Sequence, residues 1–125
     1  MDSILIFLTE SIHVSLILPA LLGVAWGIVG GSLPGISPSI TMALLLPFTY
    51  ALEPSMAIVL LASTYIGAEY GGSIPAILIR TPGTNAAAAS VIDGYEMNQQ
   101  GKAGLALGIS LYSGVIGSFV GLFFL

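Results

Sequence analysis

The chain has 125 residues, of which 56% are hydrophobic and 6% are charged, with two Lys or Arg against six Asp or Glu. Soluble domains carry about 25% charged residues, so a surface this poor in charge cannot face water all round. Two basic residues are too few for a nucleic-acid-binding patch. With no cysteine and one histidine, the chain has no disulfide framework, thiolate nucleophile or Cys/His metal site. These values exclude a soluble globular domain and point to lipid as the solvent.

The charged residues divide the chain into uncharged stretches. Hydrophobic segments are expected at about 12–33, 36–52, 54–79 and 103–125, with a polar loop at 80–102. A bilayer core about 30 Å thick needs about 20 apolar helical residues. Three segments are long enough to cross it, whereas 36–52 either crosses or dips in and returns. The sequence thus predicts an all-α, polytopic transmembrane protein with one transmembrane domain over 1–125.

The last segment, 103–125, runs to the final residue without a polar flank. Natural transmembrane helices usually end at interfacial anchors. We therefore expect the chain to be the N-terminal portion of a larger membrane protein.

Small residues recur at four-residue spacing in the hydrophobic segments. The positions are Gly23, Gly27, Gly31 and Gly35; Gly67 and Gly71; Gly104 and Gly108; and Ser113, Gly117 and Gly121. Such a strip lets the backbone of another helix approach closely. The spacing predicts helix packing within a bundle and does not by itself indicate a ligand.

A seven-residue element occurs twice, at 30–36 and again at 71–77, with five of seven positions identical. We call these the two repeat elements. Each is followed by a polar, proline-containing stretch: the first breaker, 37–39, and the second breaker, 81–85. Interrupted backbone at membrane depth must be buried in protein or line a wet cavity. Paired Gly/Pro interruptions are typical of a transporter binding site; the alternative is two ordinary loops at the membrane edge.

Both breakers carry helix-capping residues. Ser37 followed by Pro38 predicts a helix that runs through Leu46 and is kinked or ended by Pro47. In the second breaker, Thr84 or Asn85 is expected to cap a helix that begins at Ala86. Free backbone N–H groups at helix starts, flanked by hydroxyls, favour an anion such as a carboxylate. The predicted substrate-binding residues are Gly35, Ser37, Ser39, Gly72, Ser73, Thr84 and Asn85.

Glu69 lies about 15 residues into a hydrophobic run and is a candidate for a coupling or intramembrane charge; the alternative is a solvated residue near the interface. A carboxylate entering a site without basic residues is expensive to bury, and helix N-termini offset only part of its charge. Co-bound cations would supply the rest, which predicts cation symport. We expect Arg80 to be an interfacial anchor, with contact to a substrate carboxylate as the alternative. Asp93-Gly94 is expected to make a turn in a solvated loop.

Several motifs in order resemble the large membrane subunit of the tripartite tricarboxylate transporters, the TctA family. They are Leu-Pro-Gly-Ile at 33–36, Ala-Leu-Leu-Leu-Pro at 43–47, Tyr-Ile-Gly-Ala-Glu-Tyr-Gly-Gly-Ser-Ile-Pro-Ala-Ile-Leu at 65–78, Thr-Pro-Gly-Thr at 81–84, Asp-Gly-Tyr at 93–95 and Gln-Gly-Lys-Ala at 100–103. The resemblance covers about 20–121. It implies a multi-pass protein of the bacterial inner membrane that imports a carboxylate delivered by an extracytoplasmic solute-binding protein. It also implies a small membrane subunit, Na⁺ or H⁺ as the coupling ion, and a longer protein whose second half mirrors the first.

Two other classes stay open from the residues alone. The glycine strips also suit a small glycine-zipper protein that forms an oligomeric pore or serves in assembly, and the length also suits a non-functional truncated fragment. We find no acid/base pair, no nucleophile–base pair and no metal-ligand set with usable spacing, so no enzyme, no metal and no organic cofactor is predicted.

Overall fold

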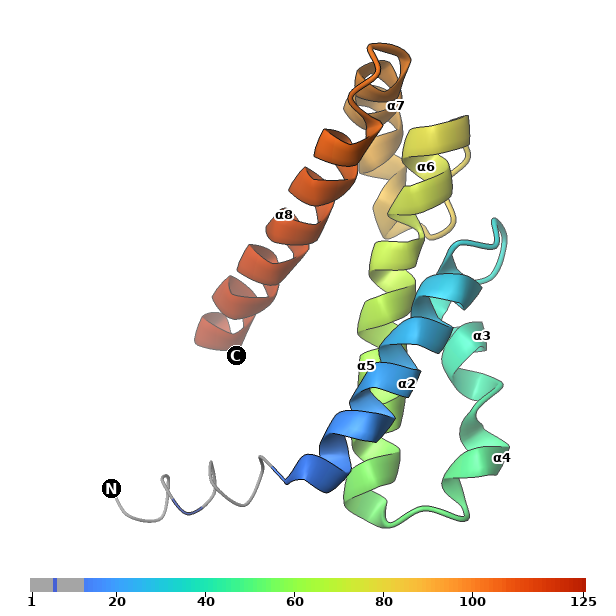
Figure 1. Cartoon of the computed structure of the whole chain (residues 1–125), viewed down its shortest axis with the longest axis vertical. Coiled ribbons are helices and arrows are strands. Elements are labelled where there is room, and N and C mark those ends of the chain that lie inside the picture. The colour runs from blue at the N-terminus through green and yellow to red at the C-terminus, as the bar shows by residue number, and fades with distance from the viewer. Residues whose placement is uncertain (1–5, 7–12) are drawn as a thin grey trace.

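A computed structural model of the chain describes residues 6 and 13–125. Its elements are α2 (Val14–Gly31), α3 (Pro38–Ala43), α4 (Leu46–Thr49), α5 (Pro54–Gly71), α6 (Ser73–Ile79), the 3₁₀ helix η1 (Ala86–Ala89), α7 (Ser90–Gln99) and α8 (Ala103–Phe124) (Figure 1). The described residues contain helices and turns and no strand. The predicted all-α fold is confirmed.

Two of these helices, α2 and α8, are long and apolar enough to cross a membrane. The two differ in how they are packed. In α2, 22% of the apolar membrane-length stretch is buried inside the chain, whereas in α8 the buried share is 6%. Figure 1 shows α8 leaving the other helices after its first turns, so that most of its length stands apart from them.

The core of the fold is a parallel pair, α2 and α5, that pack backbone against backbone (Figure 1). Gly23 lies against Leu60 and Thr64, and one turn later Gly27 lies against Thr64 and Ala68. Because both helices advance in the same direction along the contact, the pairing is parallel. A Cβ atom built on Gly23 would lie 2.5 Å from the carbonyl oxygen of Leu60. The glycine strip on α2, which predicts close packing of helices, is therefore the surface on which α5 packs.

The predicted segment 36–52 forms two short helices, α3 and α4, that run back along α2 toward the start of α5 (Figure 1). The indole Nε1 of Trp26 on α2 donates a hydrogen bond to the carbonyl oxygen of Thr41 on α3, at 3.3 Å. Gly30 lies directly against the buried side chain of Thr41. These contacts hold α3 against α2, and α3 also packs against α5.

The helix predicted from Ser37 to Leu46 is wrong in its second half. It ends at Ala43, and Pro47 lies in the first turn of α4. Proline clashes with the carbonyl four residues earlier and provides no N–H for it, and four residues before Pro47 is Ala43. The proline therefore ends the helix upstream of itself.

Replacing Pro47 by alanine is expected to join α3 and α4 into one helix, because proline disfavours a helix interior by about 3 kcal/mol. Amide hydrogen exchange of residues 44–46 in detergent micelles should slow in the variant. Pro54 is the matched control, since it occupies the first turn of α5, where its missing N–H has no helical acceptor. Unchanged exchange at 44–46 in Pro47→Ala would show that tertiary contacts, and not proline, impose the break.

The repeat elements have different structures. In the first, α2 ends at Gly31 and the chain turns through Gly35, which has a φ of +84°. In the second, Ser73–Ile79 is helical and follows α5 after a break at Gly72. Ala76 stands where the first element has Gly35, and alanine does not favour positive φ. The expectation that both elements interrupt the backbone alike is therefore wrong, and the second non-helical stretch is the second breaker.

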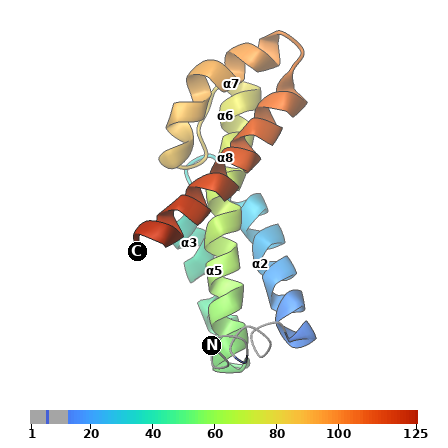
Figure 2. The same ribbon diagram turned by 90° about the vertical axis from the view of Figure 1, so that its left-hand side faces the viewer.

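The predicted loop at 80–102 is largely helical, which corrects the expectation of a solvated loop with a turn at Asp93-Gly94. Both residues lie inside α7. Gly94 is buried, and a Cβ atom there would lie 2.7 Å from the Cγ1 of Ile77 on α6. The glycine thus serves the close approach of α7 to α6, and α7 and α8 form a hairpin beside α6 (Figure 2).

Candidate functional site

The two breakers meet at one cavity of about 440 Å³, which we call the breaker cavity. Its lining residues are Gly35, Ser37, Pro38, Ser39, Tyr65, Glu69, Pro82, Gly83, Thr84, Asn85, Ala86 and Ala88. They come from the chain after α2, from one face of α5, and from the second breaker with η1. Its volume lies in the range of small-ligand pockets, about 300–1,000 Å³.

Six of the eight predicted residues line this cavity: Gly35, Ser37, Ser39, Glu69, Thr84 and Asn85. The other two do not. Gly72 is buried against the side chain of Thr84. Ser73 accepts a hydrogen bond from the hydroxyl of Ser110 on α8, at 2.9 Å, and lines a different cavity.

Three glycines bring the breakers together. The backbone N–H of Gly83 donates to the carbonyl oxygen of Gly72 at 3.1 Å. A Cβ atom on Gly83 would overlap the carbonyl oxygen of Gly31 and would lie 2.8 Å from the Cα of Gly72. The second breaker is thereby held at the ends of α2 and α5 together. Gly83 was not among the residues predicted from the sequence.

The capping predictions are confirmed at Ser37 and resolved in favour of Thr84. The Ser37 side chain accepts from the N–H of Ile40 at 3.2 Å, and Thr84 Oγ1 accepts from the N–H of Ala87 at 3.3 Å. The side chain of Asn85 makes no capping hydrogen bond. However, α3 has six residues and η1 has four, so neither carries the macrodipole of a long helix. The breakers therefore provide the cavity with hydroxyls and backbone polar groups, and not with the dipole of a long helix.

Glu69 is the acidic residue of the breaker cavity. It lies in the last turn of α5, and its Oε2 atom is buried without a hydrogen-bond partner. Tyr65 lines the cavity beside it, and it was not among the residues predicted from the sequence. The spacing of four residues puts Tyr65 and Glu69 on the same face of a helix, and that signal was available in the sequence.

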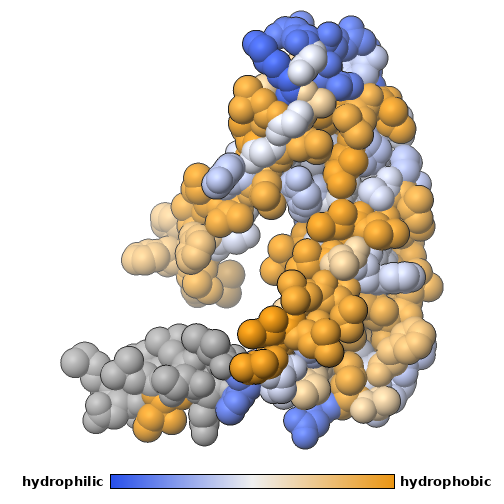
Figure 3. Space-filling view, in the orientation of Figure 1, coloured by the Kyte–Doolittle hydropathy of each residue, from blue (hydrophilic) through white to orange (hydrophobic). Residues whose placement is uncertain are grey.

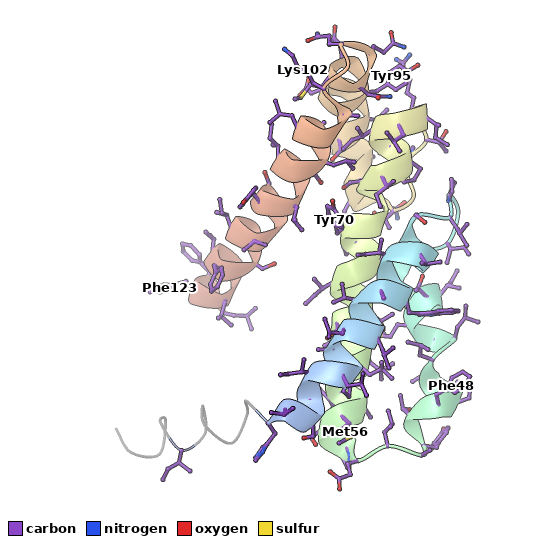
Figure 4. The ribbon with its side chains drawn as sticks, viewed as in Figure 1. Phe48, Met56, Tyr70, Tyr95, Lys102 and Phe123 are labelled. Atoms are coloured by element: carbon purple, nitrogen blue, oxygen red, sulfur yellow. The ribbon has the colours of Figure 1, made fainter. Side chains whose placement is uncertain are left out.

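Within the part of the chain that the structure describes, no basic residue lines the breaker cavity. Arg80 is exposed at the left-handed end of α6, and its guanidinium lies over the ring of Tyr95, 5.7 Å from the centroid. Lys102 is exposed where α7 turns into α8, near Tyr95 and away from Tyr70 (Figure 4). The absence of positive side chains, which the sequence predicts for the binding site, thus holds for the cavity.

A second cavity of about 840 Å³, the α8 cavity, lies between α8 and the body formed by α5, α6, η1 and α7. Figure 3 shows the hollow on this side and the hydrophobic surface along α8. Tyr70 lies on the side of α5 that faces α8 (Figure 4). Tyr65, Glu69 and Ala86 line both cavities. Glu69 therefore stands in the wall between them.

Comparison with known proteins agrees with this picture. Residues 17–125 match the sequence model of the tripartite tricarboxylate transporter TctA family. A protein of Agrobacterium vitis, described as an uncharacterized 52.8 kDa protein in the TAR-I ttuC' 3' region, is 45% identical over 97 residues, which are 78% of this chain. The match covers 18% of that relative. No solved structure matches the chain. The resemblance noted from the motifs is confirmed, and the chain belongs to the tripartite tricarboxylate transporter TctA family, a family of membrane transport proteins.

Proposed function

We propose that the chain contributes the carboxylate-binding part of a tripartite tricarboxylate-type permease, and that the breaker cavity holds the substrate. The observation that carries this proposal is the convergence of both breakers on one cavity. Irregular backbone is tolerated at membrane depth where it lines a cavity. Discontinuous segments of this kind form the substrate sites of many secondary transporters.

The cavity has the chemistry for an anion that is not held by Lys or Arg. Its polar groups include the hydroxyls of Ser37, Ser39 and Thr84 and the amide of Asn85. Hydroxyls and amides donate hydrogen bonds to a carboxylate without contributing full positive charge. Co-bound cations would then balance the substrate, and we propose symport with Na⁺ or H⁺ on that basis.

The remaining features of the proposal follow from the family. We propose that an extracytoplasmic solute-binding protein delivers the carboxylate, that a small membrane subunit joins the permease, and that the permease is a multi-pass protein of the bacterial inner membrane. For the strip on α2, the glycine-zipper alternative is disfavoured, because Gly23, Gly27 and Gly31 already pack inside the chain.

A leucine at Ser39 tests the site without removing a cap. The Ser39 side chain is exposed, lines the breaker cavity and has no hydrogen bond among the described residues. In the complete transporter, Ser39→Leu is expected to lower carboxylate uptake into proteoliposomes at least about tenfold, equivalent to about 1.4 kcal/mol, because the new side chain fills the cavity.

Ser55→Leu is the matched control. Ser55 is also exposed, but it lies in the first turn of α5, far from the cavity. Its variant should take up carboxylate at the wild-type rate. Equal uptake by Ser39→Leu and Ser55→Leu would remove the breaker cavity as the substrate site.

A further inference from the structure

Glu69 is half-buried, and its buried Oε2 atom differs from the other buried side-chain polar atoms of the described chain. Thr41 donates to the carbonyl oxygen of Ser37 at 3.1 Å, and Thr64 donates to that of Leu60 at 2.8 Å. Among the described residues, Glu69 Oε2 is the one buried side-chain oxygen or nitrogen without a hydrogen-bond partner. A buried polar atom that stays unpaired calls for a partner that the chain itself does not provide.

Among the residues that the structure describes, no positively charged side chain shares a cavity with Glu69. The titratable side chains that share its two cavities are Tyr65, Tyr70 and Asp93. Arg80 is engaged with Tyr95 at the exposed end of α6. An ionised carboxylate in an apolar environment is costly unless a cation or a proton accompanies it.

Glu69 also shares the breaker cavity with the hydroxyls assigned to the substrate. Two negative groups in one cavity repel each other, and a cation between them favours the presence of both. Because the anion is repelled by Glu69 unless a cation is present, binding of the anion depends on binding of the cation. This dependence is what a symporter requires.

We propose that Glu69 is the residue at which the coupling cation binds, with Oε2 as the atom that receives it. The proposal rests on the proposed carboxylate site in the breaker cavity and adds to it the residue that links the two ligands. The position of Glu69 in the wall of both cavities gives the cation contact with the substrate on one side and with the α8 cavity on the other.

The test uses the complete transporter in proteoliposomes and the variant Glu69→Gln, which keeps the size of the side chain and removes its charge. Two quantities are measured: exchange of labelled for unlabelled carboxylate without any gradient, and accumulation driven by a Na⁺ gradient or, separately, by a proton gradient. In the wild type, both are expected to require the cation. In Glu69→Gln, exchange should persist and no longer require the cation, while accumulation should fall at least about tenfold.

The control is Glu53→Gln at the other end of the same helix, where Glu53 is the exposed N-cap residue of α5. It should behave as the wild type in both assays. The gradient that drives wild-type accumulation identifies the cation as Na⁺ or H⁺.

Accumulation by Glu69→Gln under the gradient that drives the wild type would overturn the proposal. If Glu69→Gln loses exchange as well, Glu69→Asp decides: recovery of both activities supports cation binding at a carboxylate, and failure to recover overturns it. Absence of carboxylate exchange in the wild type would instead refute the proposed function.

Discussion

Gly27→Val is expected to prevent α2 and α5 from packing, with a loss of at least about 3 kcal/mol in the free energy of unfolding. A Cβ atom at Gly27 would overlap the carbonyl oxygen of Thr64 and would lie 2.8 Å from the amide nitrogen of Ala68. Both neighbours are backbone atoms in the middle of a helix, so neither can move aside as a flexible side chain would.

The measurement is the yield of monodisperse protein and its thermal unfolding in detergent. Gly114→Val on α8 provides the control, because a Cβ atom at Gly114 meets nothing within 4 Å. Both variants introduce the same β-branched residue into a helix and so share the same small propensity cost. If the two variants lost stability equally, the helix propensity of valine, and not the contact of α2 with α5, would explain the effect.

The variant Gly83→Ala is expected to abolish carboxylate uptake while leaving the helices folded. The added methyl group would overlap the carbonyl oxygen of Gly31 and approach the Cα of Gly72. Adding a methylene to a tightly packed site costs about 1–3 kcal/mol, and the second breaker can relieve that cost by moving away. Such a movement would separate Thr84 from Ser37 and open the breaker cavity, so uptake should fall at least about tenfold.

Gly101→Ala is the control for Gly83→Ala. Gly101 lies between α7 and α8 with a φ of +76°, and a Cβ atom there meets nothing within 4 Å. It therefore carries the backbone cost of replacing glycine without the contact at the breakers. Circular dichroism should be the same for both variants, and uptake should be lost in Gly83→Ala alone. Full uptake by Gly83→Ala would show that the three-glycine junction does not shape the site.

Local chemistry made part of the fold readable from the sequence. Ser37 before Pro38 predicts a capped helix start, and the structure has that cap. A serine cap followed by proline at the first helical position acts within one turn. The four-residue spacing of Gly23, Gly27 and Gly31 likewise predicts close packing, although it does not say which helix is the partner.

Features that depend on distant residues were not readable. The seven-residue repeat predicts two similar breaks, yet the second element, which has Ala76 in place of Gly35, is helical. Asp93-Gly94 predicts a turn, but the contact of Gly94 with Ile77 makes the glycine part of a helix interface. The role of Gly83 depends on α2 and α5 ending side by side. That arrangement cannot be predicted from the spacing of residues in the sequence alone.

The contact of α2 with α5 has a mechanical consequence. Gly27 of α2 and Gly67 of α5 bring backbone against backbone. At these points no rotatable side chains lie between the two helices, so the helices cannot shift by changes of side-chain rotamer. Close-packed interiors transmit strain and compress little. We therefore expect α2 and α5 to move together as one rigid body. In the proposed permease, we therefore expect a substrate to enter the breaker cavity by movement of the short segments at the ends of α2 and α5, and not by separation of the two helices.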